Sequence, residues 1–291
     1  MPTLEHHHSN TFVKLLLLGD AKSGKTTSLA SLVRAGYKLR ILDFDNLLDV
    51  FAMKVRDTCP DKLSNVEYRS IRDKFKGTSG GMILDGKPKA WTDSLKMLNN
   101  WSYTDETTGE IIDYGIPAQW GPDCILVIDS LSRWCDAAYD FHAVMTPAGK
   151  DGKDGRAIYG NAQDDMEKQL ATLTSPTFQT HVLVICHGTY ITQADGTTKI
   201  FPQGIGKALS PIIPQYFPNY IRMTKRGEKR TMQLTSDAVI DLATTRPDVF
   251  DKDLDPENGL AEFFAGLTKE PPAKSTSPAP RPQSVTLVRR S

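Results

Sequence analysis

Apolar residues follow one another almost without interruption in three short runs of the chain. The runs are Phe12–Leu18, Cys124–Ile128 and His181–Cys186. Runs of this kind are typical of strands that are buried on both faces of a parallel sheet. The first run continues through a glycine-rich turn into a predicted helix, Lys25–Arg34, and then into a further predicted strand, Lys38–Leu42. This order of strand, helix and strand predicts a βαβ unit at the start of the fold.

Helical and strand patterns alternate along the rest of the chain. Helical periodicity predicts five further helices, which are Leu47–Arg56, Lys89–Trp101, Leu131–Ala143, Asn161–Leu173 and Gly259–Leu267. Further predicted strands are Asn65–Ile71, Tyr220–Met223 and Thr231–Thr235, and a hairpin is predicted in Tyr190–Phe201 around Asp195-Gly196. The alternation predicts an α/β fold with a parallel-rich central sheet flanked by helices and with late antiparallel strands.

The predicted elements form one domain between two ends of different composition. Residues 11–268 contain all of the elements, whereas residues 1–10 have no such pattern. Residues 269–291 are rich in proline and serine, and we expect a disordered tail there because such a composition buries too little apolar surface. The tract His6–His8 lies in the first end, where a metal-binding role and an inert one are both open.

Charge and cysteine content exclude some classes of protein. Lysine and arginine total 35 residues and aspartate and glutamate also total 35, which argues against a uniformly basic nucleic-acid binder but allows a local basic groove. No apolar run approaches the roughly 20 residues that span a bilayer, and no signal peptide precedes the first strand. The four cysteines form no CxxC pair. We therefore expect a cytoplasmic protein with reduced thiols and no membrane partner.

A phosphate-binding P-loop joins the first predicted strand to the first predicted helix. Its residues are Gly19, Asp20, Ala21, Lys22, Ser23, Gly24, Lys25 and Thr26, and Thr27 follows in the helix. Backbone amides at such a helix N-terminus face an anion. Lys25, expected to face solvent in the empty loop, would reach the β and γ phosphates, and the Thr26 hydroxyl would bind Mg²⁺. We expect ATP and Mg²⁺ as ligands.

The run Ile125–Asp129 ends in an acid, as does the earlier strand at Asp43. In a P-loop protein the second acid-tipped strand runs beside the first, and its carboxylate holds a Mg²⁺-bound water. We therefore predict that Asp129 belongs to the metal site. Many buried strands end in aspartate only to cap the following helix, and this structural alternative is open.

Several stretches together resemble RecA. They are Gly19–Thr27, Leu42–Asp45, Val127–Leu131, Val184–His187 and Gly204–Leu209. The chain most resembles small phage RecA-like proteins that bind ATP, are grouped with single-strand annealing proteins and lack RecA's flanking domains. The resemblance implies a RecA-like P-loop NTPase fold, ATP hydrolysis, single-stranded DNA binding, annealing or homologous recombination, a homo-oligomeric ring or filament, and the host cell cytoplasm.

The resemblance also implies roles for two polar residues at strand ends. In RecA-like ATPases the catalytic carboxylate follows the second strand, two residues beyond a first acid, and Asp45 occupies that position here. RecA has glutamate at this position, so the shorter aspartate leaves the hydrolysis rate open. A polar side chain at the end of the third buried strand senses the γ-phosphate, and His187 is the candidate. A helix-starting role for Asp45 and a structural role for His187 are the alternatives.

Two loops correspond by resemblance to the DNA-binding loops of RecA-like filaments. The first, Thr146–Tyr159, carries Lys150, Lys153, Arg156 and Tyr159, and the second, Tyr190–Gly206, carries Tyr190, Lys199 and Phe201. Cations of this kind bind phosphates and aromatic rings stack on bases, although such residues are also ordinary in solvated loops.

Basic residues beyond the second loop have further candidate roles. Lys207 resembles residues of RecA-like filaments that reach the neighbouring subunit's nucleotide in trans. A cluster of Lys225, Arg226, Lys229 and Arg230 surrounds Gly227 in a predicted hairpin tip. The cluster could contact DNA or a partner, and it could equally be a solvated turn.

The sequence thus favours an ATPase that binds single-stranded DNA and promotes annealing or recombination, with a single-strand-binding protein as a candidate partner. Two other classes are open. One is a P-loop kinase of a small molecule or nucleotide, although the best candidate for its phosphate lid, Lys225–Arg230, comes late in the chain. The other is a nucleotide-gated module that recruits a protein partner through the proline-rich tail.

Overall fold

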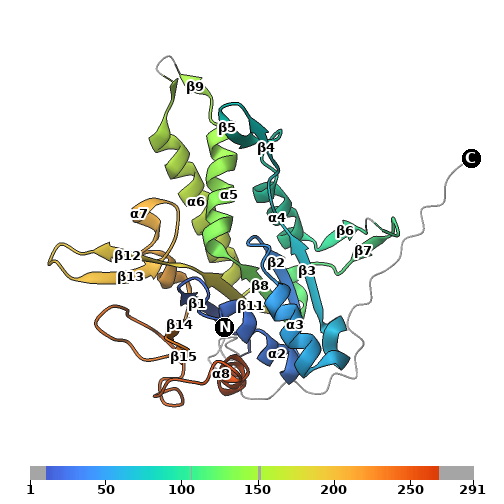
Figure 1. Ribbon diagram of the computed structural model, residues 1–291, viewed down its shortest axis with the longest axis vertical. Coiled ribbons are helices and arrows are strands. Elements are labelled where there is room, and N and C mark those ends of the chain that lie inside the picture. The colour runs from blue at the N-terminus through green and yellow to red at the C-terminus, as the bar shows by residue number, and fades with distance from the viewer. Residues whose placement is uncertain (1–10, 106, 150–151, 269–291) are drawn as a thin grey trace, which may run out of the picture.

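A seven-stranded sheet runs through the centre of the computed structural model, which describes residues 11–105, 107–149 and 152–268 (Figure 1). Its strand order is β15-β14-β1-β11-β8-β2-β3. The strands are β1 (Lys14–Gly19), β2 (Lys38–Asp43), β3 (Val66–Ser70), β8 (Gly121–Asp129), β11 (Thr180–Cys186), β14 (Asn219–Arg226) and β15 (Lys229–Gln233). All neighbouring pairs are parallel except β14 and β15, so the predicted parallel-rich sheet with a late antiparallel strand is confirmed.

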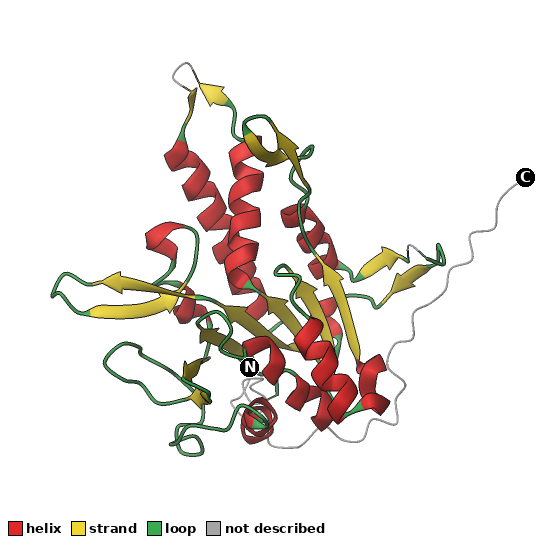
Figure 2. Cartoon of the chain, in the orientation of Figure 1, coloured by secondary structure: helices red, strands yellow, loops and turns green. Residues whose placement is uncertain are grey.

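Helices cover both faces of this sheet, as the red and yellow layers of Figure 2 show. The helices are α1 (Lys25–Ser28), α2 (Ala30–Ala35), α3 (Asp49–Thr58), α4 (Ala90–Asn99), α5 (Leu131–Met145), α6 (Gly155–Thr174), α7 (Gly206–Leu209) and α8 (Gly259–Leu267). Alternate β1 side chains enter two separate clusters: Leu16 packs with α4, α5 and α6, and Leu17 packs with α2, α3 and α8. Burial on both faces explains why these strands have uninterrupted apolar sequences.

Four two-stranded hairpins extend from this core (Figure 1). They are β4 (Phe75–Thr78) with β5 (Gly81–Leu84), β6 (Ser102–Thr104) with β7 (Ile111–Asp113), β9 (Ala148–Gly149) with β10 (Gly152–Lys153), and β12 (Gly188–Thr192) with β13 (Thr198–Pro202). The last of these confirms the hairpin predicted at Asp195-Gly196, where Gly196 has a positive φ of 83°. The β9–β10 hairpin joins α5 to α6 at the far end of a long helical arm (Figure 1).

Two predicted helices differ from the observed ones. Helix α6 begins at Gly155, six residues before the predicted start at Asn161, because the Asp154 side chain accepts a hydrogen bond from the Arg156 amide and caps the helix. The helix predicted for Lys25–Arg34 is interrupted at Leu29, whose amide bonds to the Thr26 carbonyl three residues earlier. In the part of the chain that the structure describes, none of the helices is long and apolar enough to cross a membrane.

The residues at the two ends are outside this description. The His6–His8 tract, the expected unstructured segment 1–10 and the expected disordered tail 269–291 all lie outside the described residues, so these predictions stay untested.

His181 is a buried titratable group at the amino end of β11. Its Nδ1 atom accepts a hydrogen bond of 2.8 Å from the Val13 amide, and the rings of Tyr37 and Phe264 pack against it. Burial lowers the pKa of His181 from 6.5 to about 4, and the charge of Lys14 acts in the same direction. The folded protein therefore keeps this imidazole neutral under conditions in which the unfolded chain protonates it.

We predict that His181→Gln weakens the acid sensitivity of the fold. Between pH 6.5 and about 4 the unfolded state binds a proton that folded His181 does not, so stability falls as pH falls through this window. The loss attributable to His181 is about 3 kcal/mol. Glutamine keeps an acceptor for the Val13 amide but does not titrate. Urea unfolding across the window should show a smaller loss for the variant than for the wild type, and equal losses would contradict the assignment.

Candidate functional site

The P-loop has a backbone shape that requires small residues. Gly24 has a φ of 102°, and a Cβ atom there would lie 3.0 Å from the Arg230 side chain. A Cβ at Gly19 would lie 2.6 Å from the Met223 carbonyl oxygen. The start of the loop thus packs closely against β14, and the loop turns sharply into α1 with its amides at the helix N-terminus, as an anion-binding loop must.

One polar atom of this loop is buried and unpaired. The Ser23 hydroxyl has no hydrogen-bond partner among the described residues, although the residue is fully buried. Buried polar atoms are normally satisfied, so an unpaired one in a phosphate-binding loop fits a ligand that supplies the missing partner. This observation is independent of the sequence motif.

The Lys25 side chain is buried, contrary to the expectation from the sequence. The prediction that it faces solvent in the empty loop is wrong: the residue is 6% exposed, and its Nζ donates to the carbonyl oxygens of Gly19 (2.7 Å) and Asp20 (2.9 Å). Burial lowers the pKa of Lys25, and the charges of Asp129 and Asp45 oppose that shift. A bound phosphate would compete with these two carbonyl oxygens for the Lys25 ammonium.

Thr26 and Asp129 lie together at the tip of α1 and the end of β8. The Thr26 hydroxyl donates a hydrogen bond of 2.7 Å to Asp129 Oδ2. Burial raises the pKa of Asp129 to about 7, and the Thr26 hydrogen bond and the Lys25 charge oppose the rise. A hydroxyl and a carboxylate oxygen suit Mg²⁺, which retains water and phosphate oxygens as its other ligands. The described residues contain no group of three or more His, Cys, Asp or Glu side chains that could hold a metal ion.

Asp45 lies in a small hydrogen-bonded cluster beside this pair. Its carboxylate accepts a hydrogen bond from the Ser130 hydroxyl (3.0 Å), lies 3.4 Å from His187 Nε2 and 3.9 Å from Arg133 Nε. Burial raises the pKa of Asp45, but the hydrogen bonds from His187 and Ser130 and the neighbouring charges lower it more, so the net shift is downward. Asp45 is thus held ionised.

The backbone explains why these side chains meet. Strands β2 and β8 pair in register with Asp43 opposite Asp129, so the second acid-tipped strand does run beside the first. Strand β11 separates β8 from β1 and carries His187 just beyond its end. Asp43 itself accepts a hydrogen bond of 2.6 Å from the Asn46 amide and shapes the turn. Helix α3 begins only at Asp49, so helix capping does not account for Asp45.

Arg222 is a site residue that the sequence analysis did not single out, and Arg230 is one that it named only as part of the basic cluster. Arg222 lies on β14 beside β1, and its guanidinium is 3.9 Å from Asp20 of the P-loop and 3.4 Å from the Tyr190 hydroxyl of β12. It therefore connects the P-loop to the second candidate DNA loop. Arg230 belongs to the basic cluster that was interpreted as a possible DNA or partner contact, as a solvated turn, or as the phosphate lid of a kinase, and its side chain lies over Gly24. Only the pairing of β14 with β1 brings these residues to the P-loop, and no motif signals that pairing.

A cavity of about 310 Å³ lies beside the P-loop, between α1, α3 and the β14–β15 hairpin. Thr27 and Gly24 form its inner end, and Arg230 and Val50 line its walls. Glu257, also at this cavity, forms ion pairs with Arg34 (3.0 Å) and Lys54 (2.9 Å) that fix the loop before α8.

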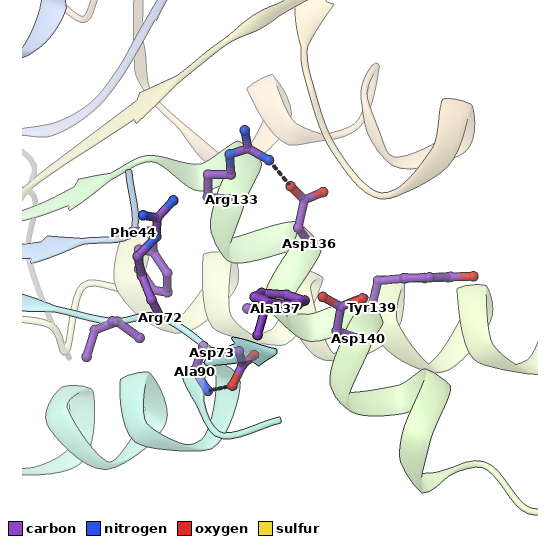
Figure 3. A pocket seen from close by; sticks show the side chains of 11 residues that line it. Phe44, Arg72, Asp73, Ala90, Arg133, Asp136, Ala137, Tyr139 and Asp140 are labelled. Atoms are coloured by element: carbon purple, nitrogen blue, oxygen red, sulfur yellow. Dashed lines mark hydrogen bonds and ion pairs between the residues drawn. The ribbon is translucent and has the colours of Figure 1, made fainter. Parts of the chain in front are cut away.

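A second cavity, of about 500 Å³, lies on the other side of Asp45 between α5 and β3–β4 (Figure 3). Arg133 points from α5 toward this space and pairs with Asp136 at 3.0 Å, as the dashed line in Figure 3 marks. Asp140 and Tyr139 lie one turn further along the helix, and burial, followed by the charge of Asp136, raises the pKa of Asp140.

The candidate DNA-binding residues are placed in different settings. Lys150 lies outside the described residues, and Lys153 is in β10. The prediction that Arg156 and Tyr159 lie in a loop is wrong, because the Asp154 cap starts α6 before them; Tyr159 packs on Tyr139 with ring centroids 4.8 Å apart.

The residues of the second loop lie on the β12–β13 hairpin and just beyond it. Tyr190 is 56% exposed on β12, whereas Lys199 on β13 pairs with Asp241 at 2.6 Å. Phe201 is half-buried on β13, and Lys207 is exposed on α7. The two candidate loops approach each other at one point, where a Cβ at Gly206 would lie 3.6 Å from the Tyr159 ring.

The fold and the site define an ATPase of the P-loop class. The chain belongs to the family described as AAA domain, whose model matches residues 11–241. No curated protein matches it.

Two solved structures resemble the chain at low identity. The crystal structure of the RadB recombinase is 14% identical with a TM-score of 0.40, covering 81% of this chain and 84% of that one. A prototypical ATPase from the type III secretion system of pathogenic bacteria is 13% identical with a TM-score of 0.38, covering 74% and 53%. Nothing about the function of this chain rests on either likeness.

We predict that Lys25→Ala abolishes nucleotide binding and leaves the fold intact. The variant removes the ammonium that phosphate would bind, and it also frees two loop carbonyls, so we expect a stability loss of about 1 kcal/mol. Calorimetric titration with ATP and Mg²⁺, together with urea unfolding, measures both effects. Undiminished ATP affinity in the folded variant would refute the assignment of this loop as the nucleotide site.

Proposed function

We propose that this chain binds ATP with Mg²⁺, hydrolyses it, and uses the nucleotide to control binding of single-stranded DNA during annealing or homologous recombination. The observation that carries the proposal is the convergence of two pairs of side chains at one end of the P-loop. Thr26 and Asp129 form one pair, and Asp45 and His187 form the other. The first pair suits a metal ion, and the second suits a water molecule beside the γ-phosphate.

The two sides of the P-loop fix the direction of the bound nucleotide. The γ-phosphate belongs at the end where Asp45 and Asp129 lie, since hydrolysis requires a carboxylate within reach of the attacking water. The nucleoside then extends the opposite way, toward the cavity of about 310 Å³ beside Thr27 and Arg230. The Arg230 guanidinium has the planar shape and charge to stack on a base or to bind a phosphate.

Each site residue has a distinct chemical task in this proposal. Lys25 neutralises phosphate charge. Thr26 and Asp129 would hold Mg²⁺, which would neutralise further phosphate charge. Asp45, held ionised by its neighbours, orients the water and accepts its proton. Ser130 and Arg133 position Asp45, and His187 detects the γ-phosphate through its contact with Asp45.

Two routes connect the nucleotide to the β12–β13 hairpin. His187 directly precedes β12, so a shift of its side chain moves the first residue of the hairpin. Arg222 bridges Asp20 of the P-loop and Tyr190 of the hairpin. Nucleotide phosphates would repel the Asp20 carboxylate and so change the contacts of Arg222 with both Asp20 and Tyr190. The hairpin would then differ between the nucleotide-bound and nucleotide-free states, as coupling between the nucleotide site and the DNA loop requires.

The proposal extends to assembly and origin through the RecA resemblance. Lys207 is exposed on α7, where it is free to reach the nucleotide of a neighbouring copy, which supports a head-to-tail ring or filament. Partnership with a single-strand-binding protein and a phage source remain part of the same proposal.

We predict that Asp129→Asn and Asp45→Asn fail differently. Asp129→Asn should weaken Mg²⁺-dependent ATP binding, because a neutral amide is a poor metal ligand. Asp45→Asn should still bind ATP, but its turnover should fall by about 10² to 10⁴ because the water loses its base. Separate measurements of ATP affinity and phosphate release distinguish the two. A normal rate in Asp45→Asn would return this residue to a structural role.

We predict that replacing Lys150, Lys153 and Arg156 together with alanine weakens binding of single-stranded DNA but not of ATP. Each lost phosphate contact should reduce the slope of log affinity against log salt by about 0.7. His187→Ala is the matched comparison: DNA binding should persist while its response to ATP disappears. Fluorescence anisotropy of a labelled oligonucleotide at several salt concentrations reports both. Absence of DNA binding in the wild type, with or without ATP, would end the DNA part of the proposal.

A P-loop kinase is the second candidate, favoured by the cavity of about 500 Å³ next to Asp45. Arg72 and Arg133 line this cavity on the side where an acceptor hydroxyl would have to approach a γ-phosphate. Phosphate transfer to an added nucleoside or small alcohol, in preference to water, would favour this function. Stimulation of phosphate release by single-stranded DNA would favour the first.

A further inference from the structure

A partly apolar groove lies beside α3, and Asp43, Asp49 and Arg56 are the charged residues that line it. The groove has a volume of about 530 Å³ and lies between α3 and β3. Three of its lining side chains are strongly exposed, Met53 at 59%, Tyr68 at 55% and Leu63 at 43%. Soluble proteins rarely leave such a contiguous apolar surface uncovered, so an occupant is expected.

Strand β3 forms one wall of this groove and is also the last strand of the central sheet. Among the described residues, no strand pairs with its outer edge (Figure 1). Its residues alternate between two sides: Val66 and Tyr68 line the groove, whereas Glu67 and Arg69 contact Tyr103 on the other side. A free edge beside an apolar groove is the surface to which an additional strand binds, through its backbone and through every second side chain.

The chain leaves the described region close to this edge. The last described residue, Thr268, hydrogen-bonds with Tyr37, which directly precedes β2. Two residues later, Leu39 of β2 pairs with Val66 of β3. The exit point is therefore separated from the start of β3 by the Tyr37 side chain, two residues of β2 and one strand spacing, together roughly 20 Å at most. Residues 269–284 can span up to about 50 Å, far more than is needed to reach the groove.

The sequence beyond Thr268 contains one segment that suits the groove. Residues 269–284 hold no bulky apolar side chain, whereas residues 285–288 read Val-Thr-Leu-Val and are followed by Arg289 and Arg290. β-Branched and apolar residues of this kind have high strand propensity. Alternation would direct Val285 and Leu287 to one side and Thr286 and Val288 to the other.

We propose that residues 285–288 of the same chain bind along the outer edge of β3 as an added strand, with Val285 and Leu287 in the α3–β3 groove. The tether makes the docking intramolecular, with an effective concentration of about 1 mM, so even a weak intrinsic affinity fills the groove. The docked segment protects an edge that would otherwise be open to pairing between copies. The inference does not depend on nucleotide or DNA binding.

Hydrogen exchange of the full chain tests the docking. Leu287→Asp places a charge in the apolar groove, and Ser284→Asp is the matched control with the same charge just outside the segment. The β3 amides that point away from β2 should exchange about tenfold faster in Leu287→Asp than in the wild type. This factor is expected when a tethered segment with a Kd of about 100 μM and an effective concentration of about 1 mM is released. Ser284→Asp should behave as the wild type does. Met53→Asp, at an exposed position, should reproduce the effect from the groove side.

A labelled peptide with the sequence of residues 283–291 provides the second arm. It should bind full-length Leu287→Asp, whose groove is vacated, and fail to bind the wild type, whose groove is filled. Equal exchange of β3 in all variants, or a peptide that binds none of them, would overturn the proposal. Protection of β3 that rises with protein concentration would mean that the segment docks between copies, which would also overturn the intramolecular form.

Discussion

The site depends on the parallel alignment of the central strands, which places all of their carboxyl ends at one edge of the sheet. Parallel pairing of β2 with β8 and of β8 with β11 brings Asp45, Asp129 and His187 together from positions far apart in the sequence. The helix N-terminus that follows β1 opens onto the same edge. An anion bound there is therefore surrounded by the side chains that suit a metal ion and a water molecule. Burial of the strands on both faces makes this alignment rigid.

Burial also sets the electrostatics of the site. Asp129 lies deep enough that its pKa rises to about 7, whereas hydrogen bonds hold the pKa of Asp45 below its ordinary value. Asp129 at the end of β8 and Asp45 two residues beyond the end of β2 thus differ in their pKa because their surroundings differ. A cation bound beside Asp129 would favour its ionised form, whereas Asp45 is ionised without one and can accept a proton.

Much of the fold was predictable from the sequence because continuous apolar runs and a P-loop leave few alternatives. Helix α8 was predicted to the residue, and the β12–β13 hairpin was predicted from Asp195-Gly196. The start of α6 was missed because Gly155 and Gly160 argue against a helix, and the capping side chain of Asp154 outweighs them. Arg222 was not identified as a site residue, and Arg230 was named only within the basic cluster, because strand order alone brings β14 and its partner β15 beside the P-loop. Contacts that depend on pairing between distant strands leave no local signal in the sequence.

The account links a hydrolytic site at the carboxyl edge of the sheet to a hairpin that begins at the same edge. The most direct test of this link is the steady-state rate of phosphate release from ATP, measured with and without single-stranded DNA. The account predicts measurable turnover that requires Mg²⁺ and rises when single-stranded DNA is added. Turnover that is unchanged by DNA and rises instead with an added phosphate acceptor would contradict it.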